Sequence, residues 1–382
     1  MSRQHDLESL ILLNALLAGK AAHEAAVLLT GGMDPRELLE RIRRENFAGR
    51  AEALAGLESR FNPQRERDLC ERSGVTLLPV TEPSYPAMLR EIYDPPLLLY
   101  LKGSWLPEDD AALAVIGSRH GSAYGELHAR KFASALAAAG WTIVSGLARG
   151  IDRAAHEGAL EIAYGRTVAV LGSGIDVVYP REHQRLYEEI QEHGAVISEL
   201  PLGSRPLAHH FPKRNRILSG LSLGVLVIEA HFKSGSLITA REALDQGREV
   251  MAMPGPVDRL TSRGTHQLLK EGAGLADTPE AVLEILSGAW RCRPRKTGST
   301  GNLPVKDFFP ALPEERTSGL APEVPVPILE TLRSEGPLCY DEIAGRGLLP
   351  LAELAGCLLE LEIGGKVRKR PDGRFSLREK SF

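Results

Sequence analysis

The feature that most constrains the fold is a repeat between about residues 110 and 290, in which short apolar runs alternate with longer amphipathic segments. Apolar runs of three to five residues match buried strands, and the segments between them match helices. Alternation of this kind predicts an α/β domain with a parallel sheet covered on both faces. The expected strands are 113–116, 142–144, 167–171, 224–228 and 250–253, and the expected helices are 124–139, 152–163, 181–193 and 236–246.

The residues before this repeat fall into two parts. Residues 76–110 lead into the sheet, and the apolar run 97–101 predicts one extra strand. Residues 1–75 alternate apolar and charged positions at helical spacing, with breaks at Gly31-Gly32 and Asn62-Pro63. They predict a small helical domain, for which a packing or adaptor role is the simplest interpretation.

The C-terminal quarter contains two segments that differ in composition. Residues 291–322 are rich in Pro, Gly, Ser and Thr and are expected to form a flexible linker. Beyond them, 328–332, 339–344 and 351–363 are expected as three short helices, and an alternating segment turns at Asp372-Gly373 as a β-hairpin would. Three helices and a hairpin predict a winged helix. The expected layout is therefore 1–75 helical, 76–290 α/β, 291–322 linker and 323–382 winged helix.

Composition excludes several classes of protein. The chain has 382 residues and a formal net charge of -4, so any anion site must come from local clustering of cations. Its four cysteines form no C-x-x-C pair and predict neither a metal site nor a disulfide framework. The apolar stretch 10–17 follows Asp6 and Glu8, unlike a signal peptide, and no run reaches the length of a membrane span. We expect a cytoplasmic protein without membrane contact.

The loops that follow the expected strands are the most informative segments. In an open parallel sheet, ligands bind outside the carboxyl ends of the strands. Glycines there let backbone N–H groups approach an anion, and helix N-termini add a favourable dipole. Each loop alone is ordinary turn chemistry, but together they predict a phosphate-binding edge. The candidate residues are Gly117, Ser118 and Arg119 after the first strand, Arg149 after the second, and Lys233, Ser234, Gly235 and Ser236 after the strand 224–228.

A basic segment, 209–216, is the second candidate. It offers Lys213, Arg214 and Arg216 near the expected start of a helix, with Pro212 at the first helical position. Cations clustered there are expected to grip successive phosphates, which makes binding dependent on salt and tolerant of sequence. A solvated basic turn is the alternative. Phe211 and Tyr124 are candidates for stacking on bases, as proteins that bind single strands require.

The sequence contains no complete catalytic motif. The segment Gly172-Ser173-Gly174 has Val177 where the third glycine of a dinucleotide fingerprint belongs, and no P-loop is present. The match of residues 220–224 to the pattern G-x-S-x-G stands between a helix and a strand, the reverse of a nucleophile elbow. We therefore expect no catalytic residues, no metal and no cofactor.

Four ordered motifs carry a family resemblance. They are Val115-Ile116-Gly117-Ser118-Arg119, residues 145–152 (SGLARGID), residues 211–217 (FPKRNRI) and residues 234–240 (SGSLITA). Over about residues 75–288 the chain resembles the DNA-processing protein A family, DprA, also called Smf. The resemblance implies a Rossmann-like fold, with an N-terminal helical domain of the SAM or HhH type and a C-terminal winged helix.

The resemblance also implies a function that the residues alone do not reach. It implies a homodimer that binds and protects incoming single-stranded DNA and loads the recombinase RecA during natural transformation. Carried over by motif, the DNA-binding residues are Arg119 with Gly117 and Ser118, then Lys213, Arg214 and Arg216, and the loop 233–236. Dimerisation at the end of the Rossmann-like domain points to Leu268 and Leu269.

Two other functions remain open. The same phosphate loops would suit a nucleotide-processing enzyme of the phosphoribohydrolase kind. A duplex-specific regulator would act through the winged helix, but its expected recognition helix, 351–363, carries Glu353, Glu360 and Glu362 and no Lys or Arg. Those carboxylates would repel phosphates in a major groove. The basic hairpin residues Lys366, Arg368, Lys369 and Arg370 can still reach a backbone, so we expect protein contact or ancillary binding from this domain.

Overall fold

The computed structural model describes residues 2–291, 326–346, 366–370 and 374–377, together with Leu354, Leu358 and Leu361. It divides into two compact units, Met1–Leu303 and Pro304–Phe382, and each is described by itself. Among the described helices, none is both long enough and apolar enough to cross a membrane.

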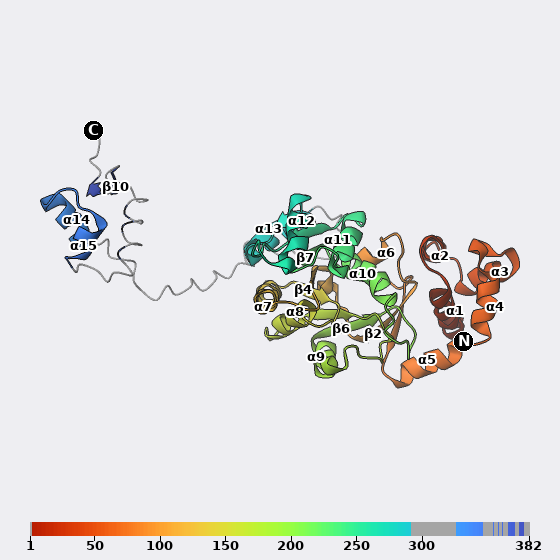
Figure 1. Ribbon diagram of the computed structural model, residues 1–382. Coiled ribbons are helices and arrows are strands. Elements are labelled where there is room, and N and C mark those ends of the chain that lie inside the picture. Colours follow the sequence, from red (N-terminus) through yellow and green to blue (C-terminus); the bar gives the residue numbers. More distant parts are fainter. Residues whose placement is uncertain are drawn as a thin grey trace. The chain divides into compact units, whose positions relative to one another are not determined.

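The first unit is built on a nine-stranded sheet with the order β1-β2-β6-β5-β4-β3-β7-β8-β9 (Figure 1). The strands from β6 to β9 in this order pair in parallel, whereas β2 is antiparallel to both of its neighbours. The α/β class is thus confirmed, with a mostly parallel sheet. The strands are β1 (Thr76–Pro79), β2 (Leu98–Gly103), β3 (Ala112–Ile116), β4 (Thr142–Ser145), β5 (Thr167–Val170), β6 (Gly194–Ser198), β7 (Gly224–Val227), β8 (Glu249–Ala252) and β9 (Gly274–Leu275).

All six strands predicted from the sequence are present, but β1, β6 and β9 were not predicted. Strand β6 begins at Gly194, directly after the last residue of the preceding helix, so no turn residues mark it off. Strand β1 has four residues and β9 has two, which is too short for a periodic pattern to be recognised.

Helices cover both faces of the sheet, as predicted (Figure 1). Side chains alternate along β3: Leu113 and Val115 pack with α7, α8 and α13, whereas Ala112 and Ala114 belong to the cluster that contains α10, α11 and α12. Helix α9 packs in a third cluster with β2, β5 and β6. The helices are α6 (Ala87–Arg90), α7 (Ala123–Ala138), α8 (Ile151–Leu160), α9 (Gln184–His193), α10 (His210–Gly220), α11 (Gly235–Asp245), α12 (Arg263–Lys270) and α13 (Pro279–Arg291).

Residues before the sheet form five helices, in agreement with the predicted helical segment. Asp34 and Asn62 cap α3 and α5 by accepting backbone N–H groups, and a proline follows each cap at the first helical position. Apolar side chains of the first four helices share one cluster with the sheet. The helices are α1 (Ser2–Leu16), α2 (Lys20–Thr30), α3 (Pro35–Glu45), α4 (Ala51–Glu58) and α5 (Pro63–Arg72).

The second unit contains α14 (Val326–Ser334), α15 (Tyr340–Ala344) and the antiparallel pair β10 (Val367–Lys369) and β11 (Phe375–Leu377). Of the predicted third helix, Leu354, Leu358 and Leu361 are helical and buried against Ile328 and Phe375. The rest of that helix, the turn Asp372-Gly373 and the predicted linker apart from Arg291 lie outside the described residues. Arg291 itself is the last residue of α13.

One polar side chain ties the helical segment to the sheet, and its removal should destabilise the fold. The amide of Asn14 donates to the carbonyl of Glu199 at 2.8 Å and accepts from the N–H of Leu98 at 3.1 Å. Asn14→Ala leaves both backbone groups without this partner, and we expect the free energy of unfolding to fall by about 1–3 kcal/mol in urea titrations followed by circular dichroism. Lys20→Ala, on an exposed side chain, is the control and should be indistinguishable from the wild type; equal stability of both variants would contradict this role for Asn14.

Candidate functional site

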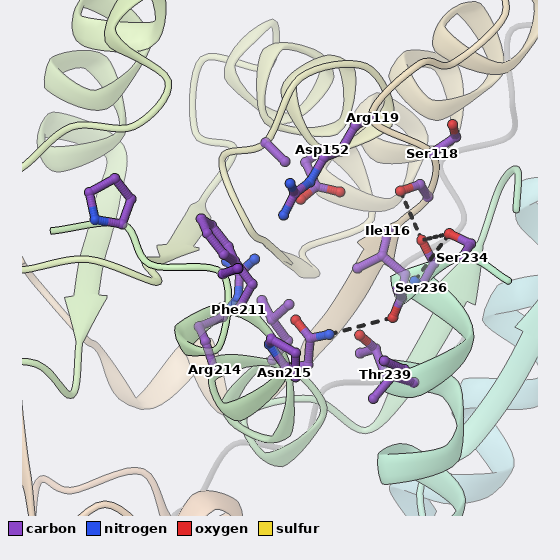
Figure 2. Close-up of a pocket in the computed structure, with 18 of the residues that line it drawn as sticks. Ile116, Ser118, Arg119, Asp152, Phe211, Arg214, Asn215, Ser234, Ser236 and Thr239 are labelled. Atoms are coloured by element: carbon purple, nitrogen blue, oxygen red, sulfur yellow. Dashed lines mark hydrogen bonds between the residues drawn. The ribbon is translucent and has the colours of Figure 1, made fainter.

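The order in which the chain adds strands to the sheet reverses between β3 and β7. From β3 the chain runs outward through β4, β5 and β6, and then returns to form β7, β8 and β9 on the other side. Loops after β3 and β7 therefore diverge, and a crevice opens at their carboxyl ends. A pocket of about 570 Å³ lies there, a size typical of ligand sites (Figure 2).

The loop after β3 forms one wall of this pocket. Gly117 is required because a Cβ there would lie 2.6 Å from a side-chain carbon of Ile151. Gly150 approaches from the next loop with φ of 71°, and a Cβ there would lie 2.4 Å from the carbonyl oxygen of Ser118. Both predicted glycine loops are thus packed against each other, which fixes the backbone on either side of Ser118 and Arg119.

The N-terminus of α11 forms the opposite wall. Ser234 caps this helix by accepting the N–H of Ser236, and the Ser236 hydroxyl donates to the carbonyl of Gly117 at 2.8 Å (Figure 2). The first-turn N–H groups of an eleven-residue helix therefore stand beside the β3 loop. Such a helix start attracts anions through its dipole and its unpaired donors.

An exposed cation and an aromatic ring stand at the mouth of the pocket. The Arg119 guanidinium carbon lies 4.7 Å from the centroid of the Phe211 ring. The centroids of the Tyr179 and Phe211 rings lie 5.9 Å apart. Arg119 enters no ion pair within the described part of the chain. The loop Gly172-Ser173-Gly174 supports this arrangement, because a Cβ on Gly172 would touch the Phe211 ring at 3.0 Å. The pair offers a positive charge and a flat surface to a ligand.

A second arginine lies buried in the floor. Arg214 donates to the carbonyls of Gly146 and Val170, and it neighbours the carboxyl of Asp152. Burial lowers the pKa of Arg214 to about 10, and Asp152 opposes that shift. Burial likewise raises the pKa of the Asp152 carboxyl, while Arg214 opposes the rise. The Arg214 side chain therefore joins the loop after β4, the end of β5 and the start of α8 beneath the pocket.

The three basic residues of the segment 209–216 are separated by the structure. Lys213 is exposed, Arg214 is buried, and Arg216 is buried on another side in ion pairs with Asp94 and Glu199. The expectation that all three grip phosphates at the first turn is therefore wrong in its geometry. Pro212 is also the third residue of α10 rather than the first, a place where its missing N–H still costs no helical hydrogen bond.

Other predicted residues lie around the pocket or away from it. Ser234, Gly235 and Ser236 line it, whereas the exposed Lys233 stands just outside. Arg149 pairs with Glu182 and lines a separate groove of about 830 Å³, which Arg119 also reaches. Tyr124 is exposed on α7 and its ring contacts His128 instead.

The two leucines predicted at a dimer interface differ in burial. Leu268 is 6% exposed and belongs to the core, because it packs in the apolar cluster on the α10–α12 face of the sheet. Leu269 is half-buried beside it. Of the pair, only Leu269 has side-chain surface to offer a partner.

Several lining residues were not assigned from the sequence. Asp152, Asn215 and Thr239 reach the pocket from α8, α10 and α11 (Figure 2). All three stood inside quoted motifs, but nothing in their spacing indicated which way the side chains point. Within the described ranges, no group of three or more His, Cys, Asp or Glu could hold a metal ion.

Comparison with known proteins identifies two regions of the chain. The chain matches the family described as DNA recombination-mediator protein A over residues 76–287, and the DprA winged helix domain over residues 313–373. It is 42% identical to Protein Smf of Escherichia coli (strain K12) over 318 residues, which cover 82% of this chain and 81% of the relative. It is 38% identical to the DNA processing protein DprA of Bacillus subtilis, over 65% of this chain and 84% of the relative.

Two solved structures are similar as well. DNA processing protein A from Streptococcus pneumoniae has a TM-score of 0.54 and 37% identity, covering 69% of this chain and 97% of that one. DNA processing protein A from Helicobacter pylori, studied for its single-stranded DNA binding mode, has a TM-score of 0.50 and 29% identity, covering 56% and 96%.

The Rossmann-like sheet and the two matched regions define a DNA recombination mediator. The chain belongs to the DNA-processing protein A (DprA/Smf) family, with that family's winged helix domain at its C-terminal end. The fold and the family predicted from the four motifs are both confirmed.

Removing the buried cation in the floor should destabilise the protein. Arg214→Met leaves the buried Asp152 carboxyl without its neighbouring cation and two carbonyls without a donor. We expect the free energy of unfolding to fall by about 3–5 kcal/mol in urea titrations. Arg185→Met, on a fully accessible side chain paired with Glu189, is the control and should not differ from the wild type. A loss at Arg214 no larger than at Arg185 would show that the floor does not depend on this arginine.

Proposed function

We propose that this chain binds single-stranded DNA in the pocket between β3 and β7. It acts as a non-catalytic mediator that protects incoming DNA and delivers it to RecA during natural transformation. The observation that supports this most is the exposed Arg119 of the β3 loop, stacked on Phe211 of α10 in a pocket that the N-terminus of α11 also lines. Cations and ring faces together suit a strand whose phosphates and bases are both accessible. The Helicobacter pylori relative, studied for its single-stranded DNA binding mode, supports the same choice of ligand.

The residues fall into two proposed roles. Arg214 and Arg216, which are buried, support α10 and thereby the position of Lys213. Direct contacts to the strand are assigned to Gly117, Ser118, Arg119, Arg149, Lys213, Lys233, Ser234, Gly235 and Ser236.

The domain layout and the assembly are proposals of the same kind. A helical domain of residues 1–75 precedes the Rossmann-like domain of 76–290, and a linker of 291–322 leads to the winged helix of 323–382. The protein acts in the cytoplasm as a homodimer. Leu269 supplies contact surface on α12, and the buried Leu268 supports it from the core.

Fluorescence anisotropy with labelled single-stranded and duplex oligonucleotides over a salt series tests the ligand. We expect preference for the single strand, and a plot of log affinity against log salt that falls by about 0.7 for each phosphate neutralised. Arg119→Glu and Lys213→Glu should each weaken single-strand binding by about tenfold or more at fixed salt, since each reverses a charge at the strand. Arg44→Glu, an equal change of net charge on α3, is the control and should bind as the wild type does.

Other outcomes favour other functions. Unchanged affinity in the Arg119 and Lys213 variants would refute the site. Turnover of a nucleotide by the pure protein, lost in Ser236→Ala, would favour the nucleotide-processing enzyme. Loss of all DNA affinity on deleting residues 323–382 would favour a duplex regulator that acts through the winged helix.

The delivery step has its own measurement. The chain should accelerate RecA assembly on a fluorescent single strand, and Arg119→Glu should abolish that acceleration because the strand is no longer held. RecA assembly at the same rate with and without the wild-type chain would contradict the mediator role.

The proposed dimer contact is tested separately. Sedimentation velocity of Leu269→Glu, in which a carboxylate enters that contact, should yield a monomer.

A further inference from the structure

A buried carboxylate lies behind the loop that carries Arg119. Glu229 lies two residues beyond the end of β7, after Ile228, and is 3% exposed. Its carboxylate accepts the N–H of Ser122 at 2.9 Å and the Ser122 hydroxyl at 2.6 Å. Its backbone carbonyl accepts the N–H of Ser118 at 2.9 Å. One residue thus holds both ends of the segment 118–122, and Arg119 lies inside that segment.

The donors around Glu229 favour a carboxylate over an amide. The Thr261 hydroxyl approaches the oxygen that also accepts from the Ser122 hydroxyl, at 3.4 Å. Both side-chain oxygens of Glu229 therefore face donors. A glutamine amide accepts at one oxygen only, and its NH₂ group would face a second donor. The Ser122 hydroxyl already accepts the N–H of Gly125 as the cap of α7, so accepting from an amide would occupy its second lone pair and turn its hydrogen away from Glu229.

The start of α7 leaves space for the buried carboxylate of Glu229. Gly125 lies in the first turn of the sixteen-residue helix α7, and a Cβ there would sit 2.4 Å from the Glu229 carboxyl carbon. The glycine therefore allows the helix start to approach the carboxylate. An N-terminal helix end favours a negative charge through its dipole and unpaired donors.

The position of the carboxylate next to an anion site calls for an explanation, since its charge opposes the binding of phosphate. We propose that Glu229 is a positioning residue for DNA binding: it fixes the 118–122 segment so that Arg119 is presented to a phosphate. This inference rests on the single-strand binding proposed above. Glu229 itself makes no contact with the strand, and its effect is transmitted through Ser118 and Ser122.

The test is a double-mutant cycle on the full chain, measured as anisotropy of labelled oligothymidylate over a salt series. Glu229→Gln should weaken binding by about tenfold. It should also reduce the salt slope by about 0.7, the contribution of one phosphate contact, as Arg119→Ala does. Because both changes remove the same contact, the double variant should bind within about twofold of Arg119→Ala alone.

A control separates positioning from general loss of stability. Asp109 is another buried carboxylate, and it lies just before β3, where the chain enters the strand rather than leaves it. It accepts from the Thr142 hydroxyl, the Leu106 N–H and the Arg166 guanidinium. Asp109→Asn should lower the unfolding temperature but leave the affinity and the salt slope unchanged. Ser122→Ala removes one donor and keeps the carboxylate, so it should weaken binding less than Glu229→Gln does. It also tests the same link if Glu229→Gln does not fold.

The outcomes distinguish the two proposals. If the wild type does not bind the single strand, both proposals fail. If Arg119→Ala weakens binding while Glu229→Gln and Ser122→Ala bind within about twofold of the wild type, only the role of Glu229 is overturned. Additive losses in the double variant, or an unchanged salt slope in Glu229→Gln, would overturn it as well.

Discussion

The pairing of β3 with β7 is the constraint on which the site depends. Residues 113–116 lie in parallel register with residues 224–227, although the chain builds three further strands between them. This pairing sets the end of β3 beside the end of β7, so that Ser118 donates to the carbonyl of Glu229. It also turns the following helices apart, which opens the pocket. The strand order therefore creates both the crevice and the scaffold of the loop that carries the exposed Arg119.

The arginines of the site have two different roles. Arg119 is exposed and rests on an aromatic ring, so its charge is available to a ligand. Arg214 and Arg216 are buried with carboxyl groups and backbone carbonyls, and they hold the loops and α10 in place. A net charge of -4 is compatible with anion binding, because binding depends on the local charge at the site rather than on the net charge of the chain.

The sequence was sufficient for the class of fold and for the loops, because strand and helix periods and glycine turns are local signals. It was insufficient for the direction of single side chains. Lys213, Arg214 and Arg216 lie within four residues, yet a helix turns by about 100° at each residue, so each cation points elsewhere. Leu268 and Leu269 differ for the same reason. Glu229 was not assigned to the site from the sequence, since its partner Ser122 lies 107 residues away in the chain and only the pairing of β3 with β7 brings them together.

Amide hydrogen exchange with and without a saturating single-stranded oligonucleotide tests whether the pocket between β3 and β7 binds DNA, because it locates the strand without altering a residue. We expect slower exchange in the β3 loop (117–122), at the start of α10 and in the first turn of α11, with little change at β10 and β11. Protection confined to β10 and β11, with these three segments unchanged, would contradict the assignment of the pocket as the DNA site.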